Sequence, residues 1–173
     1  MRVVNPWLMT DERLGPALLD AVRRVPPGGG VVFRHYATPE RERRRLFLAV
    51  RRIARARRLH VTVVGAMPGA TGRHNGPRPL TAAAHDRREA MRAVHLGAQF
   101  LFVSPVFPTR SHPGAPALGV MAAARIARGL DGRAIALGGM DARRFRRIAR
   151  LGFDGWAAID AFAPRQKRKA VPR

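Results

Sequence analysis

The stretch VVFRHYATPERERRRLFLAVRRIARARRLHVTVV at residues 31–64 decides the fold. It begins with the β-rich run Val31–Arg34 and ends with a second one, Val61–Val64. Between them, Thr38–Glu40 combines a hydroxyl cap, a proline at the first helical position and an acid in the first turn. Apolar residues then recur at spacings of three and four, at Leu46, Phe47, Val50, Ile53 and Ala54. The stretch therefore predicts a strand, a helix and a second strand parallel to the first.

The same alternation runs along the rest of the chain. Further β-rich runs lie near Val3–Thr10, Leu80–Ala83, Phe100–Ser104, Ala134–Leu137 and Gly155–Ile159, with an additional one around Thr71–Asn75. Two of the helices between them have cap signals, since Asp86 precedes Glu89 at capping-box spacing and Asp141 precedes an apolar helix face. Strands that alternate with helices in this way indicate βαβ units and a parallel sheet.

Eight such units closing on themselves form a TIM-type (β/α)8 barrel, which is an α/β fold. The chain has 173 residues, whereas the fold typically needs about 250, so we expect an abbreviated barrel. The shortfall falls at about residues 65–79, where turn residues replace any helical period, and this βα unit is predicted to be degenerate. A doubly wound open sheet is the alternative. We expect one barrel domain at residues 1–163 and a basic, disordered tail at 164–173.

Composition restricts both the chemistry and the partners. The chain has no cysteine, which excludes disulfides, thiolate metal ligands and a cysteine nucleophile. No apolar run is long enough for a membrane span and the N-terminus lacks a secretory pattern, so we expect a cytoplasmic protein with no membrane partner. The net charge of +22 is almost all arginine spread over the predicted helices, so nucleic acid is expected to bind only non-specifically, if at all.

Ligands of parallel α/β folds bind at the carboxyl ends of the strands, so residues directly after each predicted strand are the candidates for a site. ALGGM at Ala136–Met140 ends a strand with Gly138 and Gly139, directly before the helix that Asp141 caps. Paired glycines let a backbone approach an anion closely, and a helix start presents free N–H groups. This segment predicts a phosphate site, with a simple tight turn as the alternative.

Two other strand ends carry polar side chains. The loop SPVFPTRSHPGAPALG at Ser104–Gly119 is restricted by four prolines, and a loop of this length is usually functional, so we expect it to cover a ligand. Arg34 and His35 follow the second strand and His85 follows the strand at Leu80–Ala83. Either histidine could transfer protons, because imidazole titrates near neutral pH; a structural or solvated histidine is the alternative.

Four segments, taken in order, resemble the thiamine-phosphate synthases and their TenI relatives: WLMTDERLG at Trp7–Gly15, the loop at Ser104–Gly119, ALGGM, and GWAAIDAF at Gly155–Phe162. The resemblance covers nearly the whole chain and is most specific in the second half. It implies a (β/α) barrel. In the synthases it also implies coupling of thiazole phosphate to hydroxymethylpyrimidine diphosphate with release of pyrophosphate, aided by Mg²⁺.

The resemblance also assigns ligands to residues. It implies that Arg34 grips the pyrophosphate and that the loop, the paired glycines and the last strand end hold the thiazole phosphate. The residues implied to bind substrate are Arg34, Ser104, Thr109, Ser111, His112, Gly138, Gly139, Ala158 and Ile159. His85 is the implied catalytic residue, because it matches the histidine with which TenI-type thiazole tautomerases move a proton without a metal.

The departures from the family pattern concern the metal. The family's Asn-Asp pair after the third strand is replaced by Gly65-Ala66, and the segment with its second metal-binding aspartate is shortened to Thr71–Pro77. Because Mg²⁺ prefers hard oxygen donors, its expected ligands are missing here. Three interpretations stay open: a synthase or tautomerase acting on thiazole phosphate, a non-catalytic phosphate-ligand binder, and a non-specific nucleic-acid-associated protein. A homo-oligomer also stays open.

Overall fold

The computed structural model describes residues 5–109, 114, 116–130 and 133–164. Within them, all the strands are parallel and form one sheet with the order β4-β3-β2-β1-β8-β7-β6-β5. The strands are β1 Asn5–Met9, β2 Gly30–Phe33, β3 His60–Val63, β4 Gly72–Arg73, β5 Thr81–Ala84, β6 Phe100–Val103, β7 Arg133–Leu137 and β8 Gly155–Ala158. Every strand predicted from the sequence is present, with ends shifted by a few residues at most.

The sheet bends round into a nearly closed barrel. Its two edge strands, β4 and β5, meet through a parallel bridge between His74 and Thr81, and the Asn75 N–H donates to the Thr81 carbonyl at 2.8 Å. The TIM-barrel prediction is therefore confirmed, and the doubly wound open sheet is wrong.

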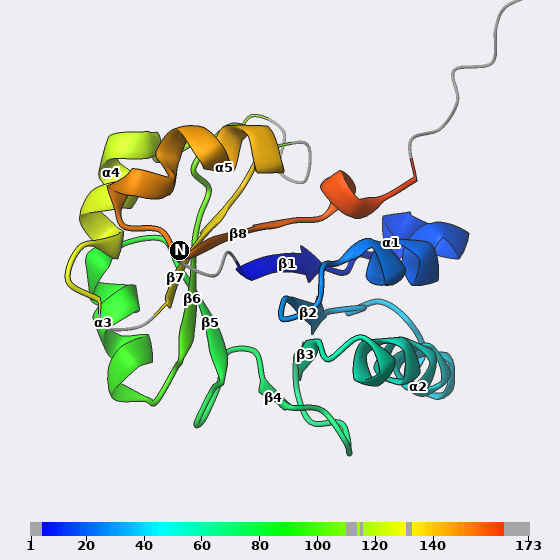
Figure 1. Cartoon of the computed structure of the whole chain (residues 1–173). Helices are drawn as coiled ribbons and strands as arrows, with labels where there is room; N and C mark the ends of the chain where they lie inside the picture. Colours follow the sequence, from blue (N-terminus) through cyan, green and yellow to red (C-terminus); the bar gives the residue numbers. More distant parts are fainter. Residues whose placement is uncertain (1–4, 110–113, 115, 131–132, 165–173) are drawn as a thin grey trace, which may run out of the picture.

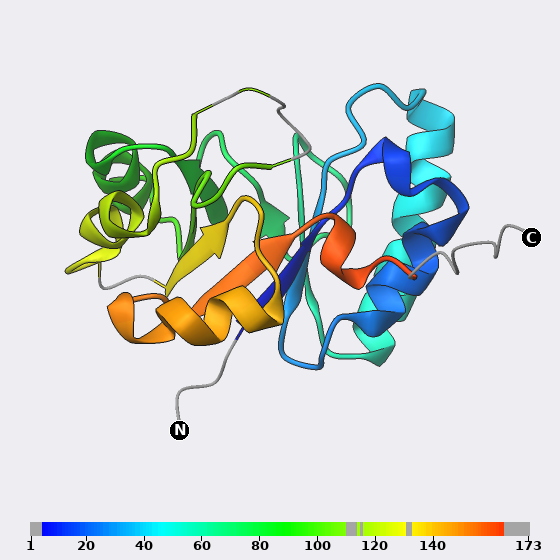
Figure 2. The ribbon, with the colours of Figure 1, turned by 90° about the horizontal axis from the view of Figure 1, so that it is seen from above.

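The helices lie on two flanks of the strands (Figures 1 and 2). One flank holds α1 and α2, and the other holds α3, α4 and α5. The helices are α1 Leu18–Arg24, α2 Glu40–Ala56, α3 Arg87–His95, α4 Val120–Ala127 and α5 Ala142–Ile148, with 3-10 turns η1 Glu12–Ala17, η2 Ala149–Leu151 and η3 Asp160–Phe162. In the described part of the chain, no helix is both long and apolar enough to cross a membrane.

The predicted degenerate unit is a pair of helix-free connections. No helix lies between β3 and β4 or between β4 and β5, all of whose residues are described, and β4 itself has two residues. Proline and glycine between residues 65 and 79 suit turns and interrupt helical period. The barrel is thus short on one side and complete in its strands.

Helix starts follow the predicted caps in two cases out of three. The Asp86 carboxylate accepts from the Glu89 N–H at 2.7 Å, and the Asp141 carboxylate accepts from the Arg144 N–H at 2.7 Å. At α2 the prediction of a hydroxyl cap is wrong, because Pro39 occupies the N-cap position without a side-chain bond. The Thr38 hydroxyl lies instead 3.4 Å from a carboxylate oxygen of Glu12, the first residue of η1.

The barrel interior is packed around Trp7, which is fully buried. Its indole ring lies 5.0 Å from the Phe100 ring and 5.4 Å from the Phe102 ring, between centroids. On the neighbouring strand a Cβ at Gly30 would lie 2.3 Å from the indole, so only glycine leaves room for the ring. This cluster fixes which faces of β1, β2 and β6 point inward.

His74 is a polar group buried where the barrel closes. Its Nδ1 lies 3.0 Å from the Thr81 hydroxyl, which donates to the Thr62 hydroxyl at 3.0 Å. Burial lowers the pKa of His74 from 6.5 to about 4, and the nearby Arg34 charge acts in the same direction. The folded barrel therefore holds this imidazole in its neutral form at neutral pH.

We predict a loss of stability on acidification that depends on His74. Its pKa is lower in the folded state, so its contribution is complete above about pH 6.5 and is lost as the pH falls towards about 4. Between about pH 7 and pH 4.5 the free energy of unfolding should fall by about 2–3 kcal/mol from this group. Urea denaturation of the wild type and of His74→Gln at the two pH values measures the difference.

The exposed His95 on α3 supplies the matched control, since His95→Gln should keep the wild-type pH dependence. A smaller dependence should remain in His74→Gln, because burial also lowers the pKa of His35. If His74→Gln and the wild type lost equal stability on acidification, the assignment of this acid sensitivity to His74 would be wrong.

Candidate active site

A cavity of about 1160 Å³ opens at the carboxyl ends of the strands. It is lined by residues that follow β2, β5, β6, β7 and β8, which lie far apart in the sequence. Among the predicted site residues, the cavity lining includes Arg34, His85, Ser104, Thr109, Gly138, Gly139, Ala158 and Ile159. Ser111 and His112 lie outside the described residues. The structure thus brings together all the described residues that the family resemblance implies, whereas His35, the other histidine candidate, does not line the cavity.

The paired glycines form a turn that packs against the loop after β6. Gly138 and Gly139 have φ angles of +95° and +60°, which residues with a side chain rarely adopt. A Cβ at Gly138 would lie 2.7 Å from the Pro105 Cα, and one at Gly139 would lie 2.6 Å from the Pro108 carbonyl oxygen. Glycine is therefore required at both positions by backbone conformation and by close approach.

Two backbone hydrogen bonds hold this turn and this loop together. The Val106 N–H donates to the Leu137 carbonyl at 2.8 Å, and the Phe107 N–H donates to the Gly138 carbonyl at 3.1 Å. The loop that carries Thr109 and the turn that carries Gly139 therefore lie side by side at the same mouth of the barrel.

The N–H groups of the turn are available to a ligand. Neither Gly138 nor Gly139 donates a backbone hydrogen bond to another described residue. The α5 helix begins directly afterwards, with the Asp141 carboxylate satisfying the Arg144 N–H. Backbone N–H groups without a protein acceptor carry positive partial charge and can donate to an anion.

Arg144 holds the glycine turn in place. Its guanidinium donates to the Gly139 carbonyl and lies 5.1 Å from the centroid of the Phe107 ring. The carbonyl and N–H of a trans peptide point in opposite directions, so fixing the Gly139 carbonyl also fixes the next N–H, that of Met140. One side chain of α5 thus links the helix, the turn and the loop after β6.

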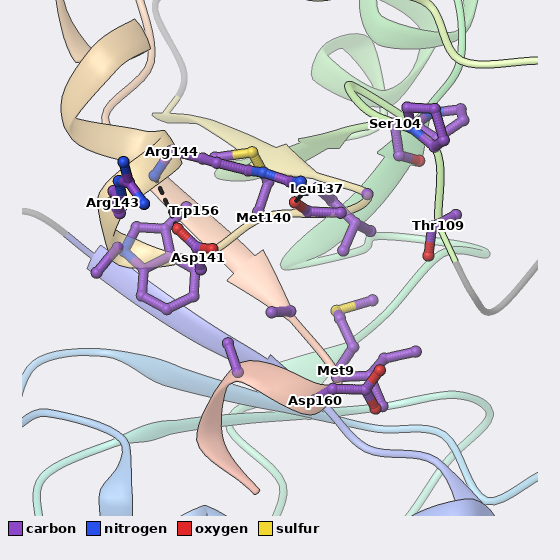
Figure 3. A pocket seen from close by; sticks show the side chains of 18 of the residues that line it. Met9, Ser104, Thr109, Leu137, Met140, Asp141, Arg143, Arg144, Trp156 and Asp160 are labelled. Carbon is purple, nitrogen blue, oxygen red and sulfur yellow. Dashed lines mark hydrogen bonds between the residues drawn. The ribbon is translucent and has the colours of Figure 1, made fainter. Parts of the chain in front are cut away.

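Figure 3 shows how the labelled side chains surround the cavity. Ser104 and Thr109 lie on one side, while Arg143 and Asp141 lie on the opposite side. Arg143 and Arg146 also line the cavity and are exposed at its rim. Sequence analysis missed the arginines of α5; the only signal was their position in the first two turns of the helix that follows the paired glycines.

Arg34 is a fixed positive charge at another part of the cavity lining. Its Nε donates to the Thr10 carbonyl at 2.8 Å, and its Nη2 lies 3.3 Å from an Asp11 carboxylate oxygen. Burial lowers the pKa of the Arg34 guanidinium, while the Asp11 charge acts in the opposite direction. Burial alone would raise the pKa of Asp11, but hydrogen bonds from Arg13 and the charges of Arg13 and Arg34 bring it below its ordinary value.

The two histidine candidates occupy different environments. His35 is 3% exposed, stacks on the Phe33 ring at 4.6 Å and lies 3.0 Å from the Thr10 hydroxyl through Nδ1. Burial lowers the pKa of His35, and its side chain does not line the cavity. His85 lines the cavity, and its side chain is 59% exposed. Of the two, only His85 can meet a ligand there.

His85 is hydrogen-bonded to the helix that follows it. Its Nδ1 lies 2.9 Å from a Glu89 carboxylate oxygen, which also accepts from the His85 backbone N–H at 2.8 Å. These hydrogen bonds, the backbone one foremost, bring the pKa of Glu89 below its ordinary value.

The donor set of the cavity does not fit a Mg²⁺ ion held by the protein. Among the described residues, its lining has two carboxylates, Asp141 and Asp160, and Asp141 already caps α5. The positions after β3 are Gly65 and Ala66, which bring no side-chain oxygen. Within the described ranges, no group of three or more histidine and acidic residues could hold a metal ion.

Comparisons with known proteins agree with this architecture. The sequence profile described as "Thiamine monophosphate synthase" matches residues 66–162, more than half of the chain. A thiamine-phosphate synthase of Thermus thermophilus is 30% identical over 157 residues, which cover 79% of this chain and 76% of the relative. One from Geobacillus kaustophilus is 35% identical over 98 residues, which cover 56% of this chain but 44% of that relative.

A solved structure shows the same fold over nearly all of both molecules. The thiamine phosphate pyrophosphorylase from Pyrococcus furiosus superposes with a TM-score of 0.77 and 23% sequence identity, covering 96% of this chain and 91% of that one. The matching profile and the Thermus relative, together with this fold, show that the chain belongs to the thiamine monophosphate synthase family.

Proposed function

We propose that this chain binds thiazole phosphate in the cavity at the barrel mouth, with the phosphate on the turn at Gly138 and Gly139. The observation that carries the proposal is the pair of glycine N–H groups that donate to no other described residue and adjoin the start of α5. Arg143 and Arg144 also line the cavity and add positive charge. Thr109, on the loop docked against the turn, offers a hydroxyl to the same phosphate.

The rest of the cavity suits a small heteroaromatic ring. Met9, Leu137, Met140 and Ile159 line it with apolar side chains. A ring that is apolar on its faces and carries an anionic arm would place the arm on the glycine turn and its faces against these residues.

The relatives named above are thiamine-phosphate synthases, which supports synthase chemistry on this ligand. In that reaction the bond between the pyrimidine methylene carbon and the diphosphate oxygen breaks, and the thiazole nitrogen forms a bond to the same carbon. Pyrophosphate leaves with the bonding electrons. The fixed guanidinium of Arg34 would offset its negative charge. The described lining offers two carboxylates, of which Asp141 caps α5, so no step is assigned to the Mg²⁺ that the family leads us to expect.

His85 favours a second candidate, a proton shift on thiazole phosphate of the TenI type. It is exposed to the cavity and hydrogen-bonded through Nδ1, which leaves Nε2 for proton transfer. This reaction needs neither a diphosphate substrate nor a metal. If the chain binds thiazole phosphate and performs neither reaction, it is a phosphate-ligand binder that has lost the chemistry.

We predict that Gly139→Ala weakens thiazole-phosphate binding about tenfold or more, because the new Cβ would displace the turn from the Pro108 carbonyl. Gly129→Ala is the matched control, since Gly129 has a similar φ of +64° and no atom within 4 Å of an added Cβ. Isothermal titration calorimetry of the wild type and both variants measures the affinities. Equal affinity in all three proteins would show that the phosphate binds elsewhere.

A second prediction separates the reactions. Arg34→Met should lower synthase turnover by about 30-fold or more, because it removes a charge-assisted hydrogen bond to the leaving pyrophosphate. The affinity for thiazole phosphate should be retained. Arg23→Met, which removes an exposed arginine paired with Asp20 on α1, should leave turnover unchanged. The measurement is pyrophosphate release with both substrates present. Wild-type turnover in Arg34→Met would remove Arg34 from the site, and absence of release by the wild type would exclude the synthase reaction.

A further inference from the structure

The Glu89 carboxylate makes two hydrogen bonds to His85 near the start of α3. It stands three residues after Asp86, the N-cap of α3, where a capping-box glutamate normally returns to the N-cap N–H. Here its carboxylate bonds instead to His85, one residue earlier, through both the backbone N–H at 2.8 Å and the ring Nδ1 at 2.9 Å. The ring contact adds nothing to the cap, so the helix end alone does not explain it.

The chemistry of a carboxylate makes this ring contact directional. An ionised carboxylate accepts hydrogen bonds and cannot donate one, and the pKa of Glu89 lies below its ordinary value, chiefly because of the His85 backbone N–H. The neutral imidazole of His85 must therefore carry its proton on Nδ1 to make the contact. Its second nitrogen, Nε2, then carries the lone pair and has no hydrogen-bond partner among the described residues.

We infer that Glu89 is the positioning residue for His85: it fixes the Nδ1–H tautomer and the orientation of the ring, so that Nε2 is the proton acceptor at the cavity. This inference rests on the second candidate function, the proton shift on thiazole phosphate. In that reaction Nε2 takes a proton from one carbon of a bound non-aromatic thiazole tautomer, and the electron pair of the broken bond enters the conjugated π system. The imidazolium then returns the proton to another carbon of that system, so the ring becomes aromatic and no oxidant or co-reactant is consumed.

The imidazolium intermediate is also stabilised by the same contact. When Nε2 carries the extra proton, the imidazolium ring and the Glu89 carboxylate form an ion pair between residues four apart at the start of α3. Both side chains are more than two-fifths exposed, so solvent screens this term and the tautomer and orientation carry the larger effect.

The variant Glu89→Gln separates positioning from capping. Glutamine keeps the shape and can still accept from the His85 backbone N–H, as capping boxes allow. Its amide can also donate to Nδ1, so it no longer selects one tautomer. Asp86→Ala is the matched structural control, because it removes the cap bond to the Glu89 N–H without touching the His85 ring.

The test is ¹⁵N NMR of the His85 ring, at a pH where the imidazole is neutral, together with proton exchange on thiazole phosphate. The wild type and Asp86→Ala should show the Nδ1–H tautomer, and Glu89→Gln should show a mixture of the two tautomers. Turnover in Glu89→Gln should fall about tenfold at unchanged thiazole-phosphate affinity, whereas Asp86→Ala should lose thermal stability and keep turnover.

Two results would overturn the inference: an Nε2–H tautomer in the wild type, or the same tautomer and turnover in Glu89→Gln as in the wild type. The wild type could instead show the Nδ1–H tautomer and bind thiazole phosphate, yet catalyse no proton exchange on that ligand. This result would support the positioning by Glu89 and overturn the proton-shift function, so the two failures are distinguishable.

Discussion

The site depends on the contact between the glycine turn after β7 and the loop after β6. Parallel strands place both segments at one mouth of the barrel, and two backbone hydrogen bonds join them. The approach is so close that no side chain fits at Gly138 or Gly139. Because the carbonyl groups of the turn bond to the loop and to Arg144, its N–H groups are left for a ligand.

The two halves of the barrel mouth differ in their helices and in the polar groups at their strand ends. The half formed by β5 to β8 keeps its helices, the glycine turn and the arginines of α5. The half at β3 and β4 has no helix in either connection, and Gly65 and Ala66 follow β3 without a side-chain oxygen. These short connections thus explain the abbreviated fold.

The strands and most helix starts could be predicted from the sequence because their signals are local. Asp86 and Asp141 cap their helices through bonds to residues three positions away, and β-rich runs identify all the described strands. The predicted cap at Thr38 was wrong because Pro39 is the N-cap and the Thr38 hydroxyl contacts Glu12, which lies far away in the sequence at the start of η1. Contacts between residues far apart in the sequence were also not predicted at the site.

At the site, too, local sequence signals were predictable and contacts between distant segments were not. The paired glycines were visible in the sequence, whereas the bond from Arg144 to the Gly139 carbonyl arises only when helix and turn are folded together. His35 and His85 both follow strands, so the sequence could not separate them. Burial and stacking on Phe33 exclude the first from the cavity, and the hydrogen bond to Glu89 orients the second.

The measurement that tests the central claim most directly is a two-dimensional ¹H–¹⁵N NMR titration with thiazole phosphate. Hydrogen bonds from backbone N–H groups to a phosphate shift their resonances strongly, so the account predicts the largest shifts at the Gly138 and Gly139 amides. Shifts concentrated on the exposed arginine-rich face of α2, or the absence of shifts at the glycine turn under saturation, would contradict it.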